Sequence, residues 1–274
     1  MRVDAHQHYW EPQRGDYGWL TPGLDAMYRD FLPDQLEPLL GKYRMDGSVA
    51  VQAAPTVEET KYLLALSDTY PSILGVVGWL DLESPGFAEA LTLQREHPKF
   101  VGIRPMIQDL PDDWLLGESV AGSMRILERQ RFPVDLQLRP RLLDSAVKLM
   151  ERVPELTAVI DHLAKPDWGQ SPVRWQEAIR RLAEYPNVMC KLSGMVPESR
   201  DRRDARMWKP YVSYILDVFG PGRVMYGSDW PVCLWSADYD RVYESLAGLL
   251  PAGPEDSRWT GLWGDNAARF YGLR

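Results

Sequence analysis

The chain has 274 residues, of which 45% are hydrophobic and 26% charged, with a formal net charge of -8. This composition is typical of a globular protein. The negative net charge and the lack of a concentrated basic patch argue against nucleic acid and anionic membranes as partners. Two distant cysteines, the lack of an apolar N-terminal segment and the lack of any membrane-length apolar run lead us to expect a cytoplasmic protein.

Strand-like and helix-like segments alternate along the whole chain. The first strand is followed by a long aromatic loop at 9–32, and the last helix by a helical tail at 254–274. The predicted strands are 3–8, 47–52, 73–80, 101–106, 133–138, 157–162, 187–193 and 223–229. The predicted helices are 33–43, 57–69, 85–96, 118–130, 141–152, 172–184, 211–218 and 239–249.

Eight such units predict an α/β fold of the (β/α)8 TIM-barrel type, with residues 1–274 as a single domain. A doubly wound open sheet is the alternative. It is disfavoured because no glycine-rich phosphate loop follows the first strand.

The first strand carries two of the four histidines of the chain, His6 and His8. Since side chains alternate along a strand, we expect Asp4, His6 and His8 to point the same way. A metal ion or an activated water uses such a pair. The alternative is a pair of solvated histidines on an exposed strand.

In a TIM barrel the chemistry gathers at the C-terminal ends of the strands. Three of the four histidines lie at predicted ends of this kind, whereas His97 lies at a helix end. The polar residues expected at these ends are His6, His8, Arg104, Gln137, Asp161, His162, Lys191, Ser193 and Asp229. Their convergence at one pole predicts an active site.

Several roles remain open from the residues alone. Asp229 facing imidazoles either binds a divalent metal or removes a proton from water, and its structural alternative is a turn cap. His162 has the alternative of a satisfied buried polar residue. Arg104 suits a carboxylate or a carbonyl oxygen, but also a salt bridge in the barrel rim. Lys191 suits the same groups as Arg104, and its structural alternative is a lysine at a strand end that snorkels or forms an ion pair.

Four segments carry a family resemblance: 4–10 (DAHQHYW), 161–166 (DHLAKP), 225–231 (MYGSDWP) and 264–271 (GDNAARFY). They resemble the amidohydrolase superfamily, and more closely its sugar-lactonase branch, which includes L-fuconolactone and L-rhamnonolactone hydrolases. The resemblance implies a TIM barrel that opens a sugar lactone, with Asp229 as the base that deprotonates water.

The resemblance also implies metal ligands, namely His6, His8, His162 and Asp229. Binuclear members place a bridging lysine or glutamate and a further histidine on middle strands. This chain has Gln137 on the fifth strand and no such histidine. We therefore expect one divalent metal, zinc, which in this branch is weakly bound or dispensable.

The hypothesis is hydrolysis of a sugar lactone, with catalytic residues Asp229, His162, His6, His8 and Arg104. Arg104 or the metal would stabilise the oxyanion. The expected substrate-binding residues are Trp10, Trp19 and Trp230 as an apolar wall, with Gln52 and Lys165 reading hydroxyls. A homodimer is the base-rate expectation for the assembly.

Three alternatives remain. A lactonase for a carboxylated aromatic-degradation intermediate (of the pyrone dicarboxylate or muconolactone type) and a metal-dependent decarboxylase keep the fold. Both need more cations than Arg104 and Lys191 supply, unless the basic loop 200–206 folds inward. A non-catalytic sugar-binding barrel is the third, and it would have no use for Asp229.

Overall fold

The computed structural model of the chain describes residues 1–167, 171–195 and 207–274. The loop 200–206, on which two of the alternatives depend, lies outside these residues. The strands are β1 (Val3–Gln7), β2 (Gly47–Val51), β3 (Ile73–Gly78), β4 (Phe100–Ile103), β5 (Val134–Leu136), β6 (Ala158–Ile160), β7 (Val188–Leu192) and β8 (Val224–Tyr226). The α-helices are α1 (Pro33–Lys42), α2 (Val57–Thr69), α3 (Phe87–Gln94), α4 (Glu118–Gln130), α5 (Leu143–Arg152), α6 (Val173–Ala183), α8 (Lys209–Phe219), α9 (Tyr239–Leu249) and α10 (Asn266–Tyr271).

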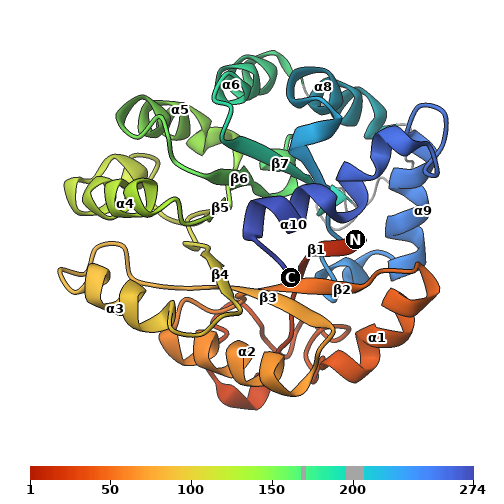
Figure 1. Ribbon diagram of the computed structural model, residues 1–274, viewed down its shortest axis with the longest axis horizontal. Coiled ribbons are helices and arrows are strands. Elements are labelled where there is room, and N and C mark those ends of the chain that lie inside the picture. Colours follow the sequence, from red (N-terminus) through yellow and green to blue (C-terminus); the bar gives the residue numbers. More distant parts are fainter. Residues whose placement is uncertain (168–170, 196–206) are drawn as a thin grey trace.

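The strands form a parallel barrel in chain order, β1 to β8, with helices around it (Figure 1). The ring is closed by backbone hydrogen bonds between β1 and the turn after β8. The Asp229 N–H donates to the His6 carbonyl at 2.8 Å, and the His8 N–H donates to the Trp230 carbonyl at 2.7 Å. The predicted (β/α)8 barrel is therefore confirmed.

Several strands are shorter than predicted, and this changes where the site residues lie. β6 ends at Ile160 and β8 at Tyr226. His162 therefore lies in the short helical turn Asp161–Ala164, and Asp229 lies in a turn after its strand. Both side chains are carried by irregular backbone directly above the barrel, which is where TIM-barrel enzymes place their chemistry.

The barrel has an apolar interior below the site. Side chains that alternate inward pack into one cluster, with members Val3, Ala5, Val49, Val51, Val77, Val101, Val159, Met189 and Met225. Helix α10 covers this interior from the N-terminal side, where it lies across the barrel in Figure 1. Ala267 and Tyr271 of α10 belong to the same cluster. The tail therefore closes the floor of the barrel.

The outer face of the sheet packs against the helices through a larger apolar cluster. Helix α5 illustrates the pattern, with Leu143, Ala146, Val147 and Met150 buried at helical spacing. Side-chain caps define the starts of two helices. Thr56 accepts from the Glu59 N–H before α2, and Asp238 accepts from the Arg241 N–H before α9.

Strand β1 contains a bulge that changes the direction of its side chains. Asp4 pairs with Ser48 and Gln7 with Ala50, so three steps along β1 match two along β2. Ala5 and His6 consequently both face inward. Asp4 faces outward, where its carboxylate accepts from the Tyr239 hydroxyl of α9 at 3.1 Å. The expectation that Asp4 points with the two histidines is wrong for this reason.

The loop 9–32 is folded back on itself. Trp10 and Phe31 exchange two backbone hydrogen bonds of 3.1 and 2.9 Å, and the Trp10 indole donates to the carbonyls of Met27 and Arg29. The loop thereby brings Trp19 and Met27 over the barrel mouth.

Among the described residues, no helix combines the length and apolarity needed to cross a membrane.

Candidate active site

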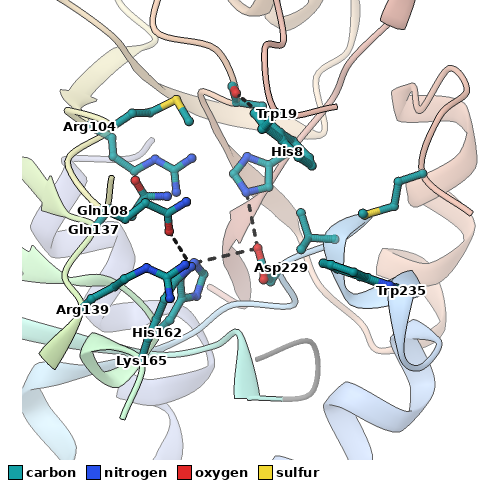
Figure 2. Close-up of a pocket in the computed structure, with 14 residues that line it drawn as sticks. His8, Trp19, Arg104, Gln108, Gln137, Arg139, His162, Lys165, Asp229 and Trp235 are labelled. Carbon is teal, nitrogen blue, oxygen red and sulfur yellow. Dashed lines mark hydrogen bonds and ion pairs between the residues drawn. The ribbon is translucent and has the colours of Figure 1, made fainter. Parts of the chain in front are cut away.

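A pocket of about 390 Å³ opens at the C-terminal end of the barrel. Its base contains His8, His162 and Asp229. Its polar lining residues are Arg104, Gln108, Gln137, Arg139 and Lys165. Its apolar lining residues are Trp19, Met27, Ala53, Met106, Val232 and Trp235. Figure 2 shows the labelled polar residues on one side of Asp229, and Trp235 on the opposite side.

The Asp229 carboxylate lies among three imidazoles. Its Oδ1 is 3.4 Å from His8 Nε2, 3.8 Å from His6 Nε2 and 4.0 Å from His162 Nε2. All four side chains are at least 94% buried. The predicted cluster of three histidines and one carboxylate is therefore assembled from β1, the residue that follows it, and the turns after β6 and β8.

Unusual backbone conformations hold this geometry. Asp229 has φ of 57°, and the four residues from His162 to Lys165 have φ between 48° and 58°. Such left-handed conformations are uncommon in residues other than glycine and cluster at functional sites. Two glycines allow the close packing that accompanies them. A Cβ on Gly194 would lie 2.5 Å from His162 Nδ1, and one on Gly227 would lie 2.6 Å from His6 Cβ.

Hydrogen bonds made by the Nδ1 atoms orient two of the rings. His8 Nδ1 is 2.7 Å from the Val51 carbonyl, which can only accept, so Nδ1 carries a proton. The Nε2 atom of a neutral His8 ring then presents a lone pair to the pocket. His162 Nδ1 is 2.8 Å from Ser193 Oγ, and its Nε2 likewise faces Asp229.

The electrostatics favour an ionised Asp229 next to neutral imidazoles. Burial alone would raise the pKa of Asp229, but the nearby His162 and His8 outweigh it and lower the pKa below its usual value. Burial lowers the pKa of His8 and lowers that of His162 well below the usual value. A carboxylate base and neutral nitrogen ligands are thus both available at neutral pH.

Arg104 is almost fully buried and all its donors face protein acceptors. Nε and Nη2 donate to Gln52 Oε1 at 3.3 and 3.0 Å, and Nη2 also donates to the Gln52 carbonyl. Nη1 lies 3.4 Å from both Asp161 Oδ2 and His6 Nε2. A guanidinium has five N–H donors, so Arg104 acts on the pocket chiefly through its charge.

A second cluster of charges lies beneath the pocket. The Lys191 ammonium is 2.5 Å from Asp135 Oδ2, 3.2 Å from Asp161 Oδ1 and 3.2 Å from His6 Nδ1. Burial raises the pKa of Asp135 to about 6. Burial would also raise the pKa of Asp161, but Lys191 and His6 hold it well below the usual value. Lys191 therefore does not reach the pocket mouth, where the sequence interpretation placed it.

The predicted substrate-binding residues divide into two groups. Trp19 and Lys165 line the pocket, whereas Trp10, Gln52 and Trp230 do not. Trp10 is fully buried and stacks behind His8 with ring centroids 6.4 Å apart. Trp230 packs against Tyr9 and Phe31. These three residues support the pocket wall from behind.

Sequence reasoning missed several lining residues. Arg139 follows Gln137 at the alternating spacing of a strand end, and this spacing was available as a signal. Gln108 lies five residues past β4 and accepts from Lys165 Nζ at 2.9 Å, a contact that no local pattern indicates. Trp235, the most exposed of the lining tryptophans at 44%, lies on the turn Val232–Trp235 after β8.

The donor set fits a divalent cation. Ligand atoms of His6, His162 and Asp229 lie within 4.8 Å of one another, and His8 Nε2 borders the same carboxylate. Two or three imidazole nitrogens with one carboxylate are typical ligands of zinc. Since Arg104 Nη1 lies 3.4 Å from His6 Nε2, a cation already competes for one of these ligands.

The amidohydrolase family model matches residues 3–273. The chain belongs to the amidohydrolase family. The match spans all eight strands and the floor helix, and it confirms the resemblance found in the four sequence segments.

Among curated amidohydrolase relatives, the chain is 38% identical to an L-fucono-1,5-lactonase of Burkholderia ambifaria, covering 99% of this chain and 95% of the relative. It is 36% identical to an L-fucono-1,5-lactonase of Burkholderia multivorans, covering 100% and 96% respectively.

Solved amidohydrolase structures agree with the fold. A crystal structure of an amidohydrolase from Burkholderia multivorans with bound zinc superposes with a TM-score of 0.92, at 36% identity and with complete coverage of both chains. A second crystal form of that amidohydrolase, with bound HEPES, gives the same values.

Proposed function

We propose that this amidohydrolase opens a sugar lactone to its sugar acid, with Asp229 as the general base. The observation that carries the proposal is the Asp229 carboxylate, ionised and within 4.0 Å of three imidazole Nε2 atoms at the base of a pocket. The two Burkholderia lactonases, related over nearly the whole chain, support the same reaction class.

In the proposed reaction, a water held between His8 and His162 loses a proton to Asp229 and attacks the lactone carbonyl. The positive charge of Arg104 stabilises the oxyanion of the tetrahedral intermediate. Asp229 then returns its proton to the ring oxygen as that oxygen leaves. Proton transfer of this kind typically accelerates a reaction by about 10²–10⁴-fold.

A divalent metal is part of the proposal, with zinc as the favoured ion. His6, His8, His162 and Asp229 would hold it, and when bound it supplies a Lewis acid that polarises a carbonyl and acidifies water. The Nδ1 contacts of His8 and His162 support this role because they direct both Nε2 atoms into the pocket.

The two-sided pocket favours an aldonolactone with one apolar face, of the class named in the Burkholderia relatives. Trp19, Val232 and Trp235 offer an apolar wall for ring carbons or a methyl group. Gln108, Gln137 and Lys165 offer amide and ammonium groups for hydroxyls. Trp10, Gln52 and Trp230 act indirectly in this proposal, by holding His8, Arg104 and the loop 9–32 in place.

The test uses a panel of aldonolactones, including L-fucono-1,5-lactone, with pyrone dicarboxylate as the competing class. Hydrolysis releases a proton that a pH indicator reports. Asp229→Asn should lower kcat/KM by about 10²–10⁴-fold. Asp113→Asn, at an exposed position outside the pocket, should leave it unchanged.

Wild-type rates in Asp229→Asn would refute the mechanism. Turnover of pyrone dicarboxylate without turnover of any sugar lactone would refute the substrate class.

We also infer a cytoplasmic setting, since Cys190 and Cys233 are both free and buried.

A further inference from the structure

A second set of metal-ligating atoms lies directly below His6, on the side away from the pocket. It consists of His6 Nδ1 and the carboxylates of Asp135 and Asp161, with ligand atoms within 4.8 Å of one another. All three side chains are fully buried. One imidazole and two buried carboxylates form a donor set suitable for a divalent ion.

The Lys191 ammonium occupies the centre of this set. Lys191 is itself fully buried, and its Nζ contacts Asp135, Asp161 and His6 at 2.5, 3.2 and 3.2 Å. An ammonium has three N–H donors and no acceptor. The ammonium donates a hydrogen bond to Asp135 Oδ2 and forms an ion pair with Asp161 Oδ1, so it occupies the position between the carboxylates that a metal ion would otherwise take.

The formal charges around this cluster balance without any ion. Asp135 and Asp161 contribute two negative charges, and Lys191 and Arg104 contribute two positive charges, with Arg104 Nη1 3.4 Å from Asp161. A divalent ion entering beside Lys191 would add two positive charges within a few ångströms of an ammonium. Repulsion between buried charges at such a separation is strong.

We propose that Lys191 is a fixed cation that takes the place of a second metal ion, and so limits this amidohydrolase to a single ion on the pocket side of His6. Lys191 is then a positioning residue, because it fixes the Asp161 carboxylate, which lies 3.3 Å from His6 Nδ1. That carboxylate accepts from Nδ1–H, and Nε2 keeps its lone pair directed at Asp229 and Arg104. The proposal concerns metal stoichiometry and does not depend on which lactone is hydrolysed.

The first test uses wild-type crystals soaked in ZnCl2 or CdCl2, with ions located by anomalous scattering. The expected result is a peak beside His8, His162 and Asp229, and none between Asp135, Asp161 and His6. A peak in the lower cluster with Lys191 in place would overturn the proposal.

The second test removes the ammonium. Lys191→Ala leaves the three ligating groups facing a space, and the purified full chain should bind one Zn²⁺ more than wild type by elemental analysis. Zinc should also raise the Tm of Lys191→Ala by about 5 °C more than that of wild type, since a ligand bound only to the folded state stabilises it. Lys148→Ala, at an exposed position of α5, is the matched control and should bind as wild type does.

The outcomes separate the proposal from a purely structural role. Folded Lys191→Ala with the zinc content of wild type would overturn it. Recovery of folded Lys191→Ala only when zinc is present during expression would support it. If the variant is insoluble under both conditions, the wild-type anomalous map decides. Loss of lactonase activity is not a readout here, so failure of the proposed reaction would be seen separately.

Discussion

The imidazole of His162 lies against Gly194 so closely that a Cβ on the glycine would be 2.5 Å from His162 Nδ1. Gly194 also has φ of +65°, a conformation that disfavours other residues. The glycine follows Ser193, whose hydroxyl contacts the same Nδ1. Ser193 and Gly194 are therefore shaped around the His162 imidazole.

Gly194→Ala should displace His162 and lower kcat/KM at least tenfold, because a positioning error near 1 Å at a reacting centre costs about 10²-fold. We also expect a loss of unfolding free energy of about 1–3 kcal/mol from the left-handed backbone. Gly122→Ala is the control, since an added Cβ in α4 meets nothing within 4 Å. Kinetics and urea denaturation measure both effects. Unchanged kinetics in Gly194→Ala would show that the contact is irrelevant to catalysis.

The pH–rate profile should have its acid limb below the ordinary carboxyl pKa of 3.8. Burial opposes ionisation of Asp229, but His162 and His8 lower its pKa, and the base is active only above that pKa. Burial lowers the pKa of His8 from its usual 6.5, so no histidine limb should have its midpoint at or above pH 6.5. Corrected for spontaneous hydrolysis, kcat/KM should be flat from about pH 7 to 8. A limb with its midpoint near pH 6.5 would assign the rate to a histidine instead.

Two tryptophans should respond oppositely to truncation. Trp235→Ala removes an exposed pocket wall and should raise KM several-fold, with the unfolding free energy within about 0.5 kcal/mol of wild type. Trp10→Ala removes a fully buried ring and should cost about 3–5 kcal/mol. Kinetics and denaturation of both variants measure this contrast. If Trp235→Ala leaves KM unchanged for every accepted lactone, Trp235 does not contact the substrate.

Tyr271→Phe tests the link between the floor helix and the charged cluster. The Tyr271 hydroxyl donates to Asp135 Oδ1 at 2.7 Å, and its loss leaves a buried carboxylate short of one donor. We expect about 1–3 kcal/mol less stability in urea denaturation. KM should not change, because Tyr271 lies outside the pocket. Tyr28→Phe, at a residue 41% exposed, is the control, and equal stability of the two variants would contradict this role.

The barrel and its site pole were predictable because both depend on local patterns. Strand-like and helix-like stretches alternate in the sequence, and parallel strands bring their C-terminal ends to one pole. His6, His8, His162 and Asp229 follow from that rule alone. Family resemblance added the roles of these residues, and the family match confirms the resemblance.

The remaining features depend on contacts between distant segments. Trp10 and Trp230 read as loop aromatics, but the backbone pairing of Trp10 with Phe31 buries the first, and Tyr9 and Phe31 cover the second. Lys191 was expected at the mouth because it lies near a strand end. Its partner Asp135 is 56 residues away, and no local pattern reports such a pairing.

The extra residue in β1 divides that strand into two phases of side-chain alternation. In the first phase Val3 and Ala5 fill the apolar interior of the barrel, and in the second His6 and His8 face the site. Ala5 of the apolar interior and His6 of the site are thus consecutive residues, about 3.3 Å apart along the strand. In a regular strand two such side chains would be two residues apart, so the bulge places His6 and the charged side chains beneath it one residue closer to the apolar interior.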